Sequence, residues 1–383
     1  MSEAQPISPF AVPMPGVPIR EGAPPITRPT KEEIAAFPAE ARTLLQQTWA
    51  TQESLLQTGR YDLRWLEGKH FLLAGATGPG IGGALAVAVL HLLGDRGSLT
   101  VLGRDLSRSL NYETGKAMQA HAEAAGFGTR FHWLNAGMAL EGKNFQAILS
   151  ALQEAGADRV IYVNTVAAAN SGLLPGMPPV YVKDVDENGL FQWQLTPLDD
   201  RAIEATRFIM GTLAVEFPRA LEAAGVTVEA AVFADWRGSL DKLGRDPSRE
   251  EYGRQGAYST SLYLPKEVIQ QAVSANYGSG KIMMDIFYPV MRTRALPFIP
   301  GGVTMARLFD TLMRKEGIRR REQPELALDT LQVIGRALTE GYDNPFPRLD
   351  GHEMPLDTWF YEVVKRLNND ENSDFYYRRW LEG

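Results

Sequence analysis

A segment with five glycines in nine residues, 75–83, has the composition of an anion-binding turn. With the residue before it, the segment reads Ala-Gly-Ala-Thr-Gly-Pro-Gly-Ile-Gly-Gly, between a short apolar run and a long apolar helix pattern. Glycine permits a tight turn and lets backbone N–H groups approach a pyrophosphate, and the dipole of the following helix favours the same anion. The alternative is a turn in which glycine serves packing only. The loop residues that we expect to bind a dinucleotide are Gly75, Thr77, Gly78, Pro79, Gly80 and Ile81.

The residues after the second apolar run select between NADH and NADPH. An acid at this place usually binds the ribose 2′-hydroxyl of NADH, whereas a basic residue accommodates the 2′-phosphate of NADPH. The sequence of 103–108 is Gly-Arg-Asp-Leu-Ser-Arg, so Arg104 favours NADPH, while Asp105 would serve NADH. A solvated loop is the alternative interpretation of the arginine. Asn135 and Ala136 follow the third strand and are further expected cofactor contacts.

Other residues with chemical potential have a better structural explanation. Tyr112 and Lys116 have the spacing of a short-chain dehydrogenase pair, but they follow the second strand, where a surface helix is expected. Residues 184–189 lack the closing acid of a calcium loop and predict a turn. The five histidines have no metal-ligand spacing and the sequence has no cysteine, so we expect no metal site.

The overall charge argues against nucleic-acid partners. The 39 lysines and arginines and 46 aspartates and glutamates give a net charge of −7, whereas proteins that bind a phosphate backbone need a basic surface. No apolar stretch is long enough to cross a bilayer, and the first residues lack a secretory signal. We therefore expect a cytoplasmic protein, a monomer or small homo-oligomer, with a small-molecule substrate and no membrane partner.

Short apolar strands alternate with helices around these residues. Strands are predicted at 71–74, 99–102, 129–134, 159–164, 226–233 and 281–288. Helical patterns begin at residue 84 and cover 112–125, 145–155, 202–224 and 265–273. This alternation predicts the α/β class, with a Rossmann-type doubly wound parallel sheet and extra helices.

The chain is predicted to divide into three regions. These are a Pro-rich arm with an N-terminal helix (1–68), an NAD(P)-binding reductase domain (69–345), and a C-terminal helical tail packed on the same domain (346–383). Thr30 precedes Lys31-Glu32-Glu33, a helix-start pattern, and we place the helix from about Pro38 to Gly59. The arm has little apolar surface, so we expect it to be extended and not needed for chemistry.

The order of these motifs resembles that of the FabV-type bacterial enoyl reductases, also described as trans-2-enoyl-CoA reductases. The resemblance runs from about His70 to the C-terminus, and residues 75–80 are similar to the glycine loop of that family with one residue fewer. Residues 295–300, followed by 312–317, carry the most specific match. Residues 160–167 are similar to the family's segment beside the nicotinamide. This similarity adds Asn164, Thr165 and Val166 to the expected cofactor contacts.

The resemblance implies a nicotinamide-dependent oxidoreductase that reduces the carbon–carbon double bond of a 2-enoyl thioester, carried on coenzyme A or on an acyl carrier protein. The family's catalytic Tyr-x8-Lys pair is best matched by Tyr258 and Lys266, which have seven intervening residues. Its Tyr-Ser-Tyr run is replaced here by Phe233-Ala234-Asp235. The alternatives are a carbonyl reductase or dehydrogenase like the short-chain dehydrogenases, and a non-catalytic NADP-binding or partner protein. The reserve candidates for the hydroxyl are Tyr252, Tyr263 and Tyr162.

We expect the protein to bind NADPH about tenfold or more tightly than NADH, because a bidentate contact between Arg104 and the 2′-phosphate is worth roughly 1.5–3 kcal/mol. Fluorescence titration with both cofactors measures the preference, and Arg104→Ala should abolish it. Equal affinities in the wild type would contradict the role given to this arginine.

Overall fold

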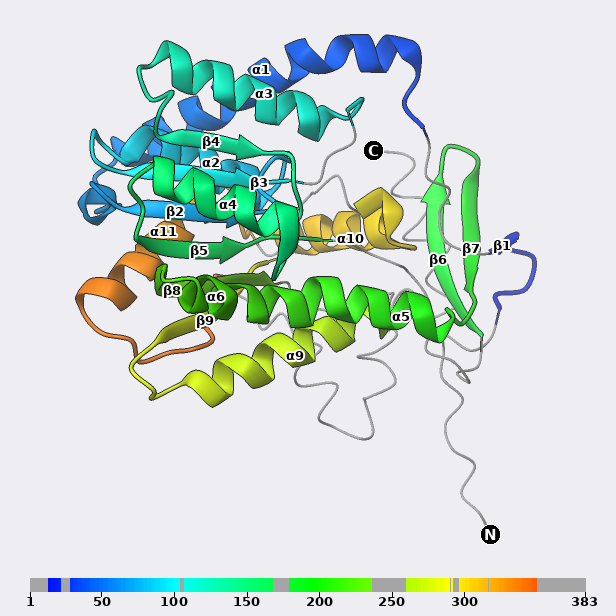
Figure 1. Ribbon diagram of the computed structural model, residues 1–383. Helices are drawn as coiled ribbons and strands as arrows, with labels where there is room; N and C mark the ends of the chain where they lie inside the picture. Colours follow the sequence, from blue (N-terminus) through cyan, green and yellow to red (C-terminus); the bar gives the residue numbers. More distant parts are fainter. Residues whose placement is uncertain are drawn as a thin grey trace.

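The central feature of the fold is a parallel sheet of six strands (Figure 1). The computed structural model describes residues 13–21, 28–103, 107–167, 179–235, 260–289, 291, 296–315 and 317–349. Across the sheet the strands are β4 (Phe131–Leu134), β3 (Ser98–Leu102), β2 (His70–Ala74), β5 (Arg159–Asn164), β8 (Thr227–Asp235) and β9 (Ile282–Phe287). Numbered along the chain, this order is 3-2-1-4-5-6, the dinucleotide-binding arrangement with its switch point between β2 and β5. The predicted Rossmann-type class is therefore confirmed.

Helices cover both faces of the sheet, which is why the strands are short and apolar rather than alternating. The helices that share an apolar cluster on one face are α2 (Ile81–Leu92), α3 (Leu110–Ala124) and α11 (Gln323–Thr339). Those that share the cluster on the other face are α4 (Gly142–Glu154), α6 (Leu213–Ala223) and α9 (Thr260–Asn276). The short helices η1 (Arg64–Leu66) and η3 (Leu296–Phe298) and the helix α10 (Gly302–Lys315) lie in the connections.

The N-terminal helix α1 (Lys31–Leu56) lies over α2, α3 and α11 as an additional layer (Figure 1). It begins at Lys31, so the expected start near Pro38 is wrong. Thr30 forms a capping box with Glu33, and these reciprocal hydrogen bonds satisfy the first N–H groups before the proline is reached. Pro38 is accommodated inside the helix, next to the buried side chain of Phe37.

A second, small sheet was not expected. It consists of β1 (Ile19–Glu21), β7 (Gly189–Leu195) and β6 (Val180–Asp186), with β6 and β7 joined as a hairpin. The turn predicted at 184–189 is confirmed only for its central residues, because Asp184 to Asp186 end β6 and Gly189 begins β7; Asp186 Oδ1 accepts a hydrogen bond from Asn188 N (2.9 Å) within it. β1 pairs in parallel with β7, so part of the Pro-rich arm is a sheet strand rather than only an extended tail.

Side-chain contacts fasten the arm to this hairpin. Arg20 pairs with Asp186 (2.5 Å), and its guanidinium lies 3.5 Å from the centre of the Phe191 ring. Gln192 is fully buried, and its amide exchanges hydrogen bonds with the main chain of Met14 (2.7 and 3.0 Å). The arm therefore adds a strand and two polar contacts to the edge of the hairpin.

The helix predicted at 202–224 has three consecutive parts. They are α5 (Asp200–Arg207), the π-helical segment η2 (Phe208–Thr212) and α6. Gly211 of η2 faces α9, and a Cβ atom at this position would lie 2.9 Å from Cα of Pro265. The glycine therefore allows the two helices to cross at close range.

β9 is the last strand of the six-stranded sheet, and its outer edge is hydrogen-bonded to the segment 345–349. Asp285 N donates to the carbonyl of Pro345 (3.0 Å), and Phe287 N donates to that of Pro347 (2.9 Å). This pairing spans the proposed boundary between the reductase domain and the C-terminal tail. The three-region division stays a prediction, because residues 350–383 lie outside the described part of the chain.

The contact between α1, α2 and α3 predicts a loss of stability in acid. Trp49 stacks on His91 at 3.8 Å between ring centres, and His121 lies 4.9 Å away. Burial, with a contribution from His121, lowers the pKa of His91 to about 4. The folded state therefore binds the proton less readily than the unfolded state, whose histidine pKa is about 6.5. The stabilisation is complete above pH 6.5 and is lost as the pH falls towards 4.

Urea unfolding at pH 8 and pH 5 measures this effect. His91→Phe keeps the ring stack and removes the titrating group, so its free energy of unfolding should fall less between the two pH values than that of the wild type. An equal fall in both proteins would contradict the role of His91.

Candidate functional site

The candidate site lies at the carboxyl edge of the sheet, where β2 and β5 separate. Thr165 N and Oγ1 both donate to the carbonyl of Ala74 (2.8 and 3.0 Å), and Gly75 N donates to that of Leu102 (2.9 Å). The loops after β2, β3 and β5 therefore leave the sheet at one level. In open α/β sheets, ligands bind in the crevice that forms at such a switch point.

The glycine loop depends on contacts between main-chain atoms. Gly75 has φ +78°, and a Cβ atom there would lie 2.8 Å from Val166 N. A Cβ atom at Gly83 would lie 2.1 Å from the carbonyl oxygen of Gly78. Gly80, the N-cap residue of α2, has no described atom within 4 Å of the Cβ position. Gly75 and Gly83 therefore allow these close main-chain contacts, and Gly80 leaves open space at the helix N-terminus.

The helix N-terminus is available to an anion. The N-cap residue of α2 is Gly80, which has no side chain to accept from the first N–H groups, so these groups depend on other partners. Thr77, within the loop, is buried, and the amide of Asn111 lies against Gly78. Asn111 was not among the residues expected at the site.

The other expected cofactor contacts are distributed along the same edge. Asn135 is exposed after β4, with Ala136 beside it. Asn164 is buried, and its Oδ1 accepts a hydrogen bond from Val166 N (3.0 Å), which shapes the turn after β5. The residues proposed to choose between NADPH and NADH, Arg104 and Asp105, lie outside the described residues. The cofactor preference therefore stays a prediction.

Lys266 forms an ion pair at the end of the next strand. Its ammonium is bonded to the carboxylate of Asp235, the last residue of β8. The side chain of Lys266 is 15% exposed and that of Asp235 is 7% exposed, so both charges are largely removed from water. Asp235 was missed as a site residue. The available signal was an acid directly after the apolar strand predicted at 226–233.

The position of Lys266 follows from the crossing of α9 and η2. Pro265, its neighbour, packs against Gly211, while Ile269 and Val273 are buried in the cluster beneath the sheet. π-Helical segments are frequent at functional sites because they change the direction of the side chains that follow. Here the π-helical segment provides the glycine contact that sets Lys266 beside β8.

Of the tyrosines considered as the catalytic hydroxyl, the structure describes the side chain of Tyr162 alone. Tyr258 and Tyr252 lie outside the described residues, and the side chain of Tyr263 is not described. Tyr162 is fully buried, its hydroxyl lies 2.9 Å from Sδ of Met138, and burial raises the pKa of the phenol well above its usual value. Tyr162 therefore cannot reach a substrate, and its place among the reserve candidates is wrong.

The interpretation of Tyr112 and Lys116 as residues of a surface helix is confirmed. Tyr112 and Lys116 lie on α3, where Lys116 pairs with Glu113 at 3.1 Å. Within the described ranges, no three His, Asp or Glu side chains gather as ligands for a metal ion. None of the helices that the structure describes combines the length and apolarity needed to span a bilayer.

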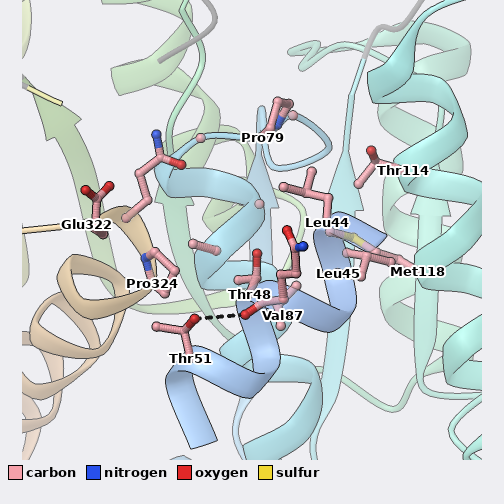
Figure 2. Close-up of a pocket in the computed structure, with 16 residues that line it drawn as sticks. Leu44, Leu45, Thr48, Thr51, Pro79, Val87, Thr114, Met118, Glu322 and Pro324 are labelled. Carbon is pink, nitrogen blue, oxygen red and sulfur yellow. Dashed lines mark hydrogen bonds between the residues drawn. The ribbon is translucent and has the colours of Figure 1, made fainter. Parts of the chain in front are cut away.

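A cavity of about 300 Å³ adjoins the glycine loop on its helical side (Figure 2). Its walls come from α1, α2, α3 and the start of α11, and include Leu44, Thr48, Pro79, Thr114, Met118 and Pro324. Neither Lys266 nor Asn164 lines it. The cavity therefore adjoins the loop at Gly78, Pro79 and Gly80, and the residues at the ends of β5 and β8 do not line it.

Two glycine substitutions should separate folding from cofactor binding. Gly83→Ala should lower the melting temperature, because the new methyl group meets the carbonyl of Gly78. Gly80→Ala has free space and a permitted φ of −142°, so it should cost at most about 1 kcal/mol of stability while it blocks the approach of a pyrophosphate.

Thermal melts without ligand and NADPH titrations of both variants provide the test. Unchanged NADPH affinity in a stable Gly80→Ala protein would place the pyrophosphate elsewhere.

Comparison of the sequence with models of protein families and with curated proteins finds no match. The structure, however, is similar to the trans-2-enoyl-CoA reductase of Clostridium acetobutulicum in complex with NAD, with TM-score 0.61 and 14% identity over 86% of this chain and 85% of that chain. It is also similar to the trans-2-enoyl-CoA reductase of Treponema denticola in complex with NAD, with TM-score 0.61 and 13% identity over 89% and 88% of the two chains. At these identities the comparison establishes a shared fold, and the chain thus has the fold of the trans-2-enoyl-CoA reductases, as the resemblance of motifs implied.

Proposed function

We propose that the protein is an NAD(P)H-dependent reductase that reduces the carbon–carbon double bond of a 2-enoyl thioester. The observation that carries the proposal is the placement of Lys266 at the carboxyl edge of β8, one strand from the switch point at which the glycine loop lies. A cofactor held by the loop would extend along this edge towards Lys266. The shared fold with reductases that were solved with NAD supports the same arrangement.

The chemistry requires a hydride, an oxyanion site and a proton. The nicotinamide transfers a hydride to the β-carbon, which leaves an enolate on the thioester and an oxidised cofactor. A hydroxyl near the thioester oxygen stabilises the enolate, and protonation of the α-carbon completes the saturated product. Tyr258 is the proposed hydroxyl donor. Lys266 would support it with its positive charge and bind the ribose of the nicotinamide.

One observation favours a second candidate, an NADP-binding protein without enoyl turnover. In the family that the sequence resembles, tyrosine hydroxyls stand after the strand that corresponds to β8, whereas here the strand ends in Phe233-Ala234-Asp235. One potential donor to the enolate is therefore replaced by a carboxylate. Retained cofactor binding without turnover would support this candidate, and turnover of ketones alone would support a carbonyl reductase.

Oxidation of NADPH and NADH with crotonyl-CoA, beside a panel of enones and ketones, tests the proposed reaction. Tyr258→Phe should lower kcat by about 10²–10⁴-fold with little change in cofactor affinity, since its hydroxyl acts mainly in the transition state. Lys266→Met should weaken both turnover and cofactor binding. Near-normal kcat in Tyr258→Phe would reject that residue and direct attention to Tyr252 and Tyr263.

A further inference from the structure

We propose that Asp235 is a positioning residue of the reaction: its carboxylate fixes the ammonium of Lys266 at the edge of the sheet along which the cofactor would extend. The inference rests on the proposed function, because it assigns the lysine to the nicotinamide ribose. The role goes to Asp235 rather than to another acid because of its place on β8, its burial and its partner.

The strand dictates where the carboxylate points. Side chains alternate along β8, and Ala231 and Phe233 both lie in the apolar cluster on the α9 side of the sheet. Asp235 continues this series and therefore faces α9, while Val232 belongs to the cluster on the opposite side. Phe233 of β8 is paired with Asn164, the last residue of β5. Asp235 comes two residues later, so β8 continues past the end of β5, where cofactor contacts are expected.

Both partners of the ion pair are attached to rigid elements. The main-chain carbonyl of Asp235 accepts a hydrogen bond from Tyr288 N (2.9 Å), which holds the end of β8 against the chain after β9. Lys266 follows Pro265, which is packed against Gly211. A lysine side chain on its own has a flexible stem, and a fixed carboxylate selects one position of its charged end.

The chemistry of an ammonium explains what this fixing achieves. The group carries three N–H donors and a full positive charge, and a carboxylate that accepts from it fixes the position of both. A nearly buried lysine without its counter-ion would be costly and would move towards water. Asp235 thus compensates the charge and holds the ammonium at the end of β8.

A matched acid on the same strand serves as control. Glu229 is close to the amino end of β8, and its side chain is 11% exposed. It pairs with Lys69 (3.1 Å) and Arg159 (2.8 Å). Glu229→Gln removes an equally sheltered acid from the same strand, at about 20 Å from Asp235 for six residues of extended chain. It should lower stability and leave cofactor binding unchanged.

The test measures NADPH dissociation constants, crotonyl-CoA kinetics and melting temperatures for Asp235→Asn, Asp235→Glu, Glu229→Gln and the double variant Asp235→Leu/Lys266→Met. Asp235→Asn should raise the NADPH dissociation constant about tenfold or more and lower kcat, because the loss of a charged hydrogen-bond partner has this size. Asp235→Glu, which keeps the charge, should lose less. The double variant replaces the ion pair with apolar side chains, so it should regain melting temperature without regaining NADPH affinity.

The outcomes separate a positioning role from a structural one. Wild-type NADPH affinity and kcat in Asp235→Asn, or recovery of both in the double variant, would overturn the proposal and leave only a stabilising ion pair. A wild-type protein that binds neither NADPH nor NADH would instead overturn the proposed function. If the wild type binds NADPH but does not reduce crotonyl-CoA, the dissociation constants of the variants still decide the role of Asp235.

Discussion

Main chain packs directly on main chain where the glycine loop turns from β2 into α2, and the position of the remaining elements follows from this contact. Gly75 lies against the backbone of Val166, and Gly83 lies against the carbonyl of Gly78, at separations that exclude any side chain. The turn is short enough for α2 to begin at the sheet edge with its N–H groups directed outwards. Since β2 and β5 are neighbours whose connections depart in opposite directions, the same contact creates the crevice.

The two sides of the crevice are built by different physical means. On the side of the glycine loop, backbone groups and a helix dipole offer an uncharged, preorganised surface to an anion. On the side of β8, a lysine and an aspartate introduce full charges that are tolerated because they compensate each other. The π-helical segment brings α9 close enough for the second arrangement, so the position of Lys266 depends on a helix that is remote from the glycine loop in the sequence.

The sequence predicted the sheet well because the six parallel strands are buried on both faces and therefore appear as apolar runs. The 159–164 strand was predicted with its observed bounds. The small second sheet was missed because its buried positions include the polar residue Gln192, whose burial depends on hydrogen bonds to Met14 in the distant N-terminal arm. The same reason explains the early end predicted for β8: Asp235 is polar, and its burial requires Lys266 from the next helix. Local patterns cannot reveal such long-range compensation. The start of α1 was placed too late for a different reason: the capping box at Thr30 begins the helix at Lys31, and Pro38 is accommodated inside it.

The pairing of β1 with β7 has a consequence for the order in which the chain acquires its structure. Ile19 is aligned with Gln192, so the two strands are far apart in sequence, and such a closure is slow compared with local contacts. At typical synthesis rates, the ribosome needs roughly ten to thirty seconds to proceed from one strand to the other. The segment that contains β2, β3, β4 and β5 emerges entirely within this interval. β1 therefore waits for its partner strand until four of the six strands of the nucleotide-binding sheet have been made.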